Sequence, residues 1–278
     1  MASTAHPEEW IENRPSRGLR WPDPKELWRY RELAWFLALR DVKVRYKQAA
    51  FGAAWAVLQP LASVVVFTVV FGHFANVPSE GIPYPVFVLA GLTAWSYSSA
   101  TVTRTTQSLV GNAGLVTKVY FPRLLAPVAS ILPGLVDFLL SLVVLAVFLV
   151  IYRIQPTWAL AVVPAWIILM VVSVFGVGLL FGTLNVSYRD INQAIALVVQ
   201  LWLFVSPVAY PSSVVPPGWR PVYFANPMAG VIEGIRWSAL GTPWPGAVVL
   251  ISVASAVVLL VGGIMYFEHT ERRFADVI

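Results

Sequence analysis

The stretch APVASILPGLVDFLLSLVVLAVFLVI, residues 126–151, carries a single charged side chain, Asp137. A helix needs about 20 mostly apolar residues to cross the hydrocarbon core of a bilayer. Lipid offers no partner to unpaired backbone groups, so a stretch of this kind is stable in a membrane only as a helix. It therefore predicts a membrane-spanning helix and, with it, the class of the protein.

The same composition extends along the chain. Of the 278 residues, 58% are hydrophobic and 12% are charged, whereas soluble domains carry roughly 25% charged residues. We expect an all-α membrane protein with six transmembrane helices at about residues 53–74, 85–103, 126–151, 158–186, 192–210 and 246–267. The chain has no cysteine, which excludes disulfides and cysteine metal sites.

The basic residues are unevenly distributed between the expected connections. Sixteen of the nineteen lysines and arginines fall before the first span, in the second and fourth connections, or in the C-terminal tail. Because positive charge accumulates in cytoplasmic loops, both termini are predicted to be cytoplasmic. The accumulation of lysine and arginine on the cytoplasmic side of the membrane also explains the net charge of +5, so no nucleic-acid partner is expected.

The segment before the first span divides into two parts. Residues 1–22 form a polar tail with no apolar core, which excludes a signal peptide. Asp23 and Pro24 are typical of a helix start. Residues 23–48 then predict an amphipathic helix in the membrane interface, since aromatic and basic residues occupy different sides. The alternative is an ordinary soluble helix packed on a partner.

Residues 211–245 are interrupted by prolines but contain a helical pattern after Asn226, a predicted N-cap that Pro227 follows. The pattern is too short to span a bilayer. Non-helical backbone at membrane depth survives only inside protein or beside a wet cavity. We interpret this region as a re-entrant helical element on the outer face, with a plain extracellular loop as the alternative.

Five motifs resemble those of the permease subunit of ABC-type polysaccharide exporters, the family for O-antigen, capsule, teichoic acid and galactan. They are RYKQAAFGAAWAVLQPL (45–61), NAGLVTKVYFPR (112–123), YRDI (188–191), SPVAYP (206–211) and NPM with IR (226–236). The resemblance covers the chain from about residue 25 to its end. It implies that residues 49–278 form the six-span permease domain, which pairs with a second copy of itself and with two copies of a separate ATPase.

In that family a lipid-pyrophosphate-linked glycan is carried out of the cytoplasm across the bacterial inner membrane. The sequence is consistent with a transport subunit, because it contains no G-x-x-x-x-G-K-[ST] phosphate loop. It also shows no nucleophile–base pair and no metal-ligand spacing. We expect no enzymatic activity and no cofactor in this chain, with ATP and Mg²⁺ bound by the partner ATPase.

The polar-aromatic segment 112–123, called the island below, lies between two apolar runs on the predicted cytoplasmic side. The resemblance implies that it is the coupling helix that docks on the ATPase, and buried aromatic anchors with arginines suit such a contact. Positive-inside anchoring alone is the alternative. The predicted coupling residues are Asn112, Lys118, Val119, Tyr120, Phe121 and Arg123, with a weaker contact at Arg189 and Asp190.

Asp137 is the most unusual single residue, because a carboxylate at the centre of a span costs about 2.5–3.5 kcal/mol on insertion scales. It could carry a proton or contact substrate. We favour a structural hydrogen bond inside the bundle, since ABC exporters run on ATP and not on protons.

The resemblance also implies that the first and fifth spans line a channel between two protomers. Aromatic faces with scattered amides suit sugar polymers. The candidates are Trp55, Gln59, Phe67, Gln200, Trp202, Phe204 and Tyr210, and some of them are equally suited to lipid or to the protomer core.

The sequence thus favours a permease for a lipid-linked polysaccharide. An ABC permease for a small amphiphile, such as a drug or a lipid, is the alternative. A membrane-embedded enzyme of glycan assembly is disfavoured because the acid/base constellation is absent.

Overall fold

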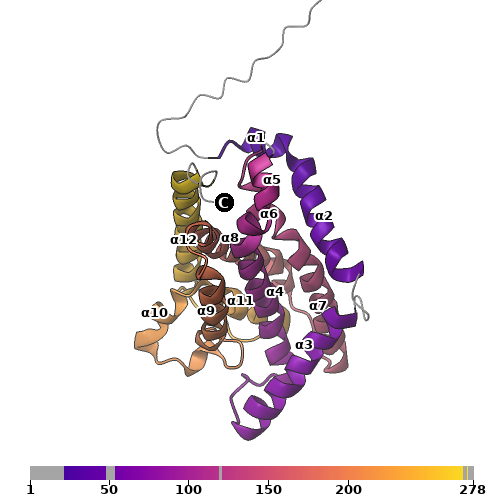
Figure 1. The fold of residues 1–278 in the computed structure, drawn as a ribbon. Coiled ribbons are helices and arrows are strands. Elements are labelled where there is room, and N and C mark those ends of the chain that lie inside the picture. Colours follow the sequence, from indigo (N-terminus) through magenta and orange to yellow (C-terminus); the bar gives the residue numbers. More distant parts are fainter. Residues whose placement is uncertain (1–21, 48–53, 119–120, 272–273, 275–278) are drawn as a thin grey trace, which may run out of the picture.

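A computed structural model describes residues 22–47, 54–118, 121–271 and 274 (Figure 1). Its described residues are helical with connecting turns and contain no strand. The longer helices run up and down in one bundle. One end of it carries the first short helix, the island and the C-terminal end of the last helix.

Two helices precede the bundle. Helix α1 (Pro24–Arg29) begins at Asp23, whose carboxylate accepts a hydrogen bond of 2.9 Å from the Lys25 amide, so the predicted N-cap is present. Helix α2 (Arg31–Lys47) follows after a break at Tyr30. The single helix expected over residues 23–48 is therefore two helices.

Helix α2 packs against the bundle through small and apolar residues. Ala34, Leu37 and Ala38 are buried, whereas Trp35 is 57% exposed. The predicted aromatic face is therefore not the face that contacts protein. The exposed tryptophans Trp28 and Trp35 are placed as an interfacial helix would need them, because tryptophan prefers headgroup depth.

Four segments are long and apolar enough to cross a membrane: Ala54–Phe74, Leu125–Ile151, Trp158–Ser187 and Val249–Thr270. They contain helix α3 (Ala54–Phe67) with the π turn η1 (Thr68–Phe74), α6 (Leu125–Ala129) with α7 (Leu132–Ile151), the 3₁₀ turn η2 (Trp158–Val162) with α8 (Val163–Ser187), and α12 (Val249–Thr270). The expected spans near 53–74, 126–151, 158–186 and 246–267 correspond to these four.

The two other expected spans differ from the four. Helix α4 (Tyr84–Gly111) has ample length but carries many hydroxyl side chains, and α9 (Ile191–Val205) is apolar but shorter. Helix α4 lies in the middle of the bundle and contacts α3, α7, α8, α9 and α11. Most of its side chains are buried, so its serines and threonines face protein, which explains why its composition is less apolar than that of an exposed span.

The region predicted to be re-entrant contains short turns and two helices. These are η3 (Ser212–Val214), η4 (Pro217–Trp219), α10 (Arg220–Phe224) and α11 (Pro227–Leu240). Helix α11 begins at Asn226, whose side chain accepts from the Met228 amide at 3.0 Å, as predicted. It ends at Gly241, which adopts φ +72°, the left-handed conformation that glycine provides at helix ends. Nearly every residue of α11 is buried among α4, α8 and α12.

Glycines allow the central helices to approach closely. A Cβ on Gly178 would lie 2.6 Å from Thr105 of α4, and one on Gly182 would lie 3.1 Å from the Thr105 carbonyl oxygen. Gly176 and Gly263 meet backbone to backbone at the crossing of α8 and α12. Such pairs increase dispersion contacts in a bilayer, where apolar surface alone gives no driving force for association.

Candidate functional site

The island begins where α4 ends. Asn112 caps α4, donates to the Ser108 carbonyl at 2.7 Å, and accepts from Nη2 of Arg40 at 3.0 Å. Helix α5 (Ala113–Lys118) follows. Val119, Tyr120 and the side chain of Lys118 lie outside the described residues. Asn112 therefore ties the island to α2.

Phe121 points into the protein. It is 4% exposed and packs in a cluster with Leu37 and Ala38 of α2 and with Leu125 and Ala129 of α6. A side chain that is already buried has almost no area left for a partner protein. Phe121 thus holds the island against α2, and the expected direct anchoring of an ATPase by this ring has no support in its position.

Arg123 connects the island to the C-terminal end of the chain. Its Nη1 donates to the backbone carbonyl of Glu271. Burial raises the pKa of the Glu271 carboxyl, and the positive charge of Arg123 opposes that shift. Phe274 is fully buried in edge-to-face contact with Phe267, with ring centroids 5.5 Å apart. Arg123 and the packing of Phe274 thus attach the end of α12 to this end of the bundle.

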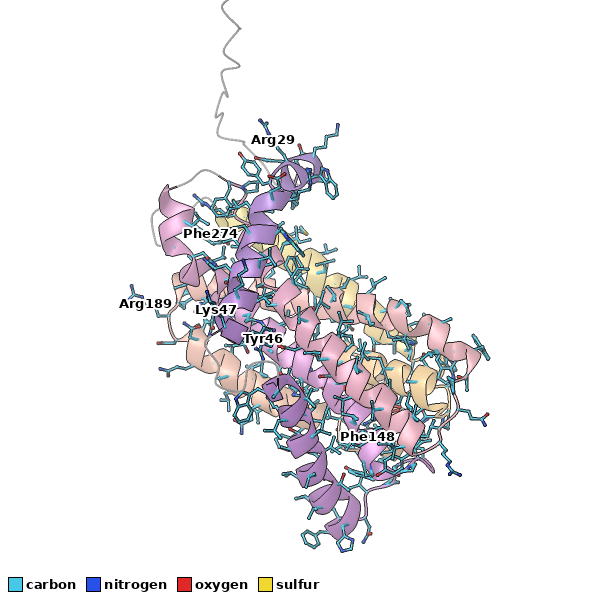
Figure 2. The ribbon with its side chains drawn as sticks, turned by 90° about the vertical axis from the view of Figure 1, so that its right-hand side faces the viewer. Arg29, Tyr46, Lys47, Phe148, Arg189 and Phe274 are labelled. Atoms are coloured by element: carbon cyan, nitrogen blue, oxygen red, sulfur yellow. The ribbon has the colours of Figure 1, made fainter. Side chains whose placement is uncertain are left out.

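Arg189 and Asp190 lie in the turn between α8 and α9. Both are exposed, and the Asp190 backbone carbonyl accepts from the Gln193 and Ala194 amides to start α9. Figure 2 shows Arg189 projecting away from the bundle. Of the predicted coupling residues with a described side chain, Arg189 and Asp190 are the two that remain fully open to a partner.

Asp137 has partners from α2. Its Oδ2 lies 2.7 Å from Nη1 of Arg45, and its Oδ1 accepts a hydrogen bond from the Tyr46 hydroxyl. Burial and this hydrogen bond raise the pKa of Tyr46 to about 12, so the phenol stays a donor at neutral pH. The carboxylate lies one to two turns inside α7 and ties the end of α2 to it. A structural hydrogen bond inside the bundle was expected from the sequence, whereas the ion pair with Arg45 was not.

The arrangement around Asp137 gives the first prediction. Asp137→Asn keeps an acceptor for Tyr46 but loses the charge that pairs with Arg45, so we expect about 1 kcal/mol of lost stability, a small value because Arg45 is 42% exposed. Asp137→Leu removes both partners and should cost about 2–3 kcal/mol. The measurement is the thermal stability of the purified chain, together with export. Full stability of the Asn variant with loss of export would mean that the charge acts in transport.

The predicted channel residues divide into two groups. Trp55 and Gln59 on α3, and Gln200 and Phe204 on α9, are exposed on the outside of the bundle. The remaining three are half-buried: Phe67 packs on the core, Trp202 donates to Asn226 Oδ1 at 2.8 Å, and the Tyr210 hydroxyl donates to the Phe204 carbonyl at 2.9 Å. The first group therefore presents more surface to a substrate or a second protomer.

A buried ion pair in α11 was missed by the sequence analysis. Arg236 is fully buried and donates to the carbonyls of Val208 at 2.7 Å, Phe87 at 3.2 Å and Tyr210 at 3.3 Å. Its Nη1 lies 3.3 Å from Glu233, one turn earlier on the same helix, and Glu233 accepts from the Ser212 amide at 3.1 Å.

Arg236 thus joins α4 and the turns after α9 to α11. Its guanidinium also stacks on the Phe87 ring, 3.6 Å from the centroid. The charge distribution along the sequence places Arg236 among the three basic residues expected on the outer face, whereas the structure buries it. The signal that could have corrected this is the Glu-x-x-Arg spacing inside an otherwise apolar helix, which places opposite charges on one face.

The described residues hold no group of three histidine, cysteine or carboxylate side chains that could bind a metal ion. The island end combines the packed aromatic rings of Phe121, Phe267 and Phe274 with the exposed side chain of Arg189. Such a surface suits binding of a partner or of an anionic group.

Comparison with known proteins gives a consistent result. A family described as ABC-2 type transporter matches residues 32–240. The chain is 30% identical over 261 residues to the O-antigen export system permease protein RfbA of Myxococcus xanthus, covering 91% of this chain and 98% of that protein. It is 29% identical over 241 residues to the RfbA protein of Klebsiella pneumoniae, covering 86% and 92%.

A further relative is named for the transport of a different polymer. The polysialic acid transport protein KpsM of Escherichia coli is 24% identical over 205 residues, which cover 71% of this chain and 77% of that protein.

Proposed function

The chain belongs to the ABC-2 type transporter family, and we propose that it is the permease subunit of an ABC transporter that exports a lipid-linked polysaccharide. The observation that carries this is its similarity, over most of its length, to permeases named for O-antigen export. None of the relatives reported above is named for a drug or a lipid, so the small-amphiphile alternative has no comparable support. The protein is a multi-pass membrane protein.

Deleting the gene tests the function. The polymer should disappear from the cell surface while its lipid-linked form accumulates at the cytoplasmic face of the inner membrane, because synthesis continues without export. The wild-type gene should restore the surface polymer. Unchanged surface polysaccharide in the deletion strain would contradict the proposed function.

We further propose six spans, with both termini and the island in the cytoplasm. The charge distribution supports this orientation, and α4 and α9 supply the two spans beyond the four apolar ones. The outer faces of α3 and α9 carry exposed apolar side chains such as Val65 and Leu201, which a second copy of the chain would cover.

The proposed orientation can be tested by labelling single cysteines. It places residue 213 outside and residue 107 at the cytoplasmic end of α4. A cysteine at Ser213 should therefore react with an impermeant thiol reagent added to intact cells, and a cysteine at Gln107 should not.

ATP and Mg²⁺ belong in this proposal to a partner ATPase, and the permease itself performs no covalent chemistry. We place the ATPase at the end of the bundle that carries the island and the α8–α9 turn. Two features support this. The turn exposes Arg189 and Asp190, and the Phe121 cluster holds the island in a fixed position against α2.

The docking proposal predicts different behaviour for two residues. Arg189→Glu reverses an exposed charge and should weaken ATPase association by about 1 kcal/mol, or fivefold. The effect should be largest at low salt, where the charge is least screened, and easiest to detect at high dilution. Its thermal stability should not change. Phe121→Ala empties a buried site and should lower stability by about 3–5 kcal/mol, with loss of the ATPase as a consequence. The measurements are copurification of the ATPase and the melting temperature of the permease.

Arg153→Glu is the matched control, because Arg153 is an exposed arginine after α7, on the predicted outer side. It should leave ATPase association unchanged. Equal copurification with the Arg189 and Arg153 variants would remove the α8–α9 turn from the docking surface, without affecting the export function tested by deletion.

A further inference from the structure

Three tryptophans, called the tryptophan cluster below, meet where α11 ends and the turn before α8 begins. Trp158 lies in η2, Trp237 in the last turn of α11, and Trp244 in the connection between α11 and α12. The Trp237 ring stands at the centre. Its centroid lies 5.8 Å from that of Trp158 and 4.7 Å from that of Trp244, with interplanar angles of 84° and 67°. Both contacts are edge-to-face, so the three indoles pack as one unit.

The two outer rings of the cluster are open to the surroundings. Trp158 is 79% exposed and Trp244 is 50% exposed, whereas Trp237 is half-buried between them. Pro243 and Pro245 flank Trp244 and restrict the backbone that carries it. The cluster therefore presents an aromatic surface that its own ring contacts hold in place.

The exposed indoles have no polar partner in the protein. The buried neighbour Trp166, whose ring centroid lies 6.1 Å from that of Trp244, donates from Nε1 to Ser238 Oγ at 2.9 Å. Among the described residues, none accepts a hydrogen bond from Nε1 of Trp158 or of Trp244. A ring with an apolar body and an unpaired polar edge fits the boundary between hydrocarbon and water, where tryptophan is enriched in membrane proteins.

The position of the cluster along the chain places it at such a boundary. Of the segments that are long and apolar enough to cross a membrane, one ends at Ile151, the next begins with Trp158 itself, and another begins at Val249, shortly after Trp244. The two spans that begin here expose large apolar side chains farther along, such as Ile168 on α8, as helices surrounded by lipid do. Because the ends of spans mark where the hydrocarbon core stops, the cluster lies at headgroup depth.

The connection between α7 and η2 adds a cation to this surface. Arg153 is exposed, and no described carboxylate pairs with it. The adjacent Tyr152 is 39% exposed and stacks on Phe148 of α7, with ring centroids 6.0 Å apart. Arginine near the end of a span reaches the headgroup phosphates, and tyrosine shares the interfacial preference of tryptophan. The charge and the rings together match a layer of lipid headgroups.

We propose that the tryptophan cluster contacts the headgroup layer of the membrane and holds the C-terminal end of α11 at the membrane surface. Helix α11 has 14 residues and is too short to cross a bilayer, so its depth is not set by its own length. Interfacial aromatic anchors set the placement of such elements. Trp237 belongs to α11 and Trp158 precedes α8, so the shared contact fixes α11 at the level where α8 enters the membrane. The proposal applies to either orientation of the chain and to any exported polymer.

Tryptophan fluorescence of the full-length chain in phosphatidylcholine vesicles tests the lipid contact. One set of vesicles carries a quenching nitroxide on the headgroup, and another carries it near the end of the acyl chain. The emission that is removed by Trp158→Phe or by Trp244→Phe should be quenched more strongly by the headgroup nitroxide than by the acyl-chain nitroxide. Trp166→Phe is the matched control, because this ring is 6% exposed and its emission should be quenched by neither lipid.

A second measurement reads the depth of the connection that carries Trp244. The chain has no cysteine, so a spin label on a single cysteine at the exposed Ala247 reports its access to a water-soluble nickel complex relative to oxygen. Replacing Trp158 and Trp244 together by serine should increase the access of the nickel complex. Replacing both by tyrosine keeps rings with a polar edge and should retain the wild-type ratio.

Three results would overturn the proposal. Quenching of the Trp158 and Trp244 emission by neither lipid would place the cluster in water, and stronger quenching by the acyl-chain nitroxide would place it in hydrocarbon. An unchanged access ratio at residue 247 in the double serine variant would show that the cluster does not hold the connection. If purified surface polysaccharide changed the emission while neither lipid quenched it, the surface would serve the polymer, and the lipid contact would be rejected.

Discussion

Arg236→Met is expected to lower the free energy of unfolding by about 3–5 kcal/mol, the range observed when one partner of a buried ion pair is removed. The variant leaves the Glu233 carboxylate buried without its cation, and the carbonyls of Val208 and Tyr210 lose a charged donor. The turns after α9 would then keep the contact of the Ser212 amide with Glu233 but lose the contacts that Arg236 makes to them. The measurement is the fraction of chain that stays monodisperse after heating in detergent.

Arg220→Met is the matched control for this prediction. Arg220 also donates to two backbone carbonyls, those of Val215 at 3.2 Å and Ser213 at 3.4 Å, but in a partly exposed position. Its loss should cost less than about 1 kcal/mol, because water replaces the lost contacts.

A double variant separates the charge from the packing. In Glu233→Gln with Arg236→Met, no unpaired carboxylate remains, so part of the lost stability should return. If Arg236→Met were no less stable than Arg220→Met, the α11 ion pair would have no structural role.

Two neighbouring glycines in α12 should respond to the same substitution with opposite signs. A Cβ on Gly263 would lie 2.8 Å from the Gly176 carbonyl oxygen, a backbone atom that can move only if α8 and α12 separate. Gly263→Ala should therefore cost about 1–3 kcal/mol. A Cβ on Gly262 would meet no atom within 4 Å. Gly262→Ala should be neutral or stabilising by up to about 1 kcal/mol, the difference in helix propensity.

The melting temperatures of the two purified variants give the comparison, with Gly262→Ala serving as the control for helix propensity. The reciprocal change, Gly176→Ala, places a Cβ 2.6 Å from the Leu260 amide nitrogen and should resemble Gly263→Ala. Equal effects at residues 262 and 263 would show that the close crossing of α8 and α12 does not contribute to stability.

Much of this protein could be predicted from local sequence. The four most apolar segments follow from hydropathy alone, because a run of side chains that cannot be hydrated needs no distant residue to identify it. The helix starts at Asp23 and Asn226 were also found, since an N-cap is a contact between residues two apart. The family followed from short motifs, and the comparisons agree with it.

The tertiary structure decided what covers each side of a helix. The sequence placed Phe121 on the island as an anchor for the ATPase, but α2 packs over it, and α2 meets the bundle through Ala34, Leu37 and Ala38 while Trp35 stays exposed. Periodicity gives the direction of a side chain about its own helix axis. It does not say which other helix lies there.

The charged residues show the same limit more strongly. Arg104 and Arg236 were counted among the charges flanking the membrane, yet both extend into the bundle, and Arg236 reaches carbonyls from residues far away in the chain. Asp137 pairs with Arg45 on α2, which lies roughly ninety residues earlier in the chain. An ionisable group in an apolar chain is stable only beside partners that compensate its lost hydration, and the folded arrangement of helices alone determines where those partners lie.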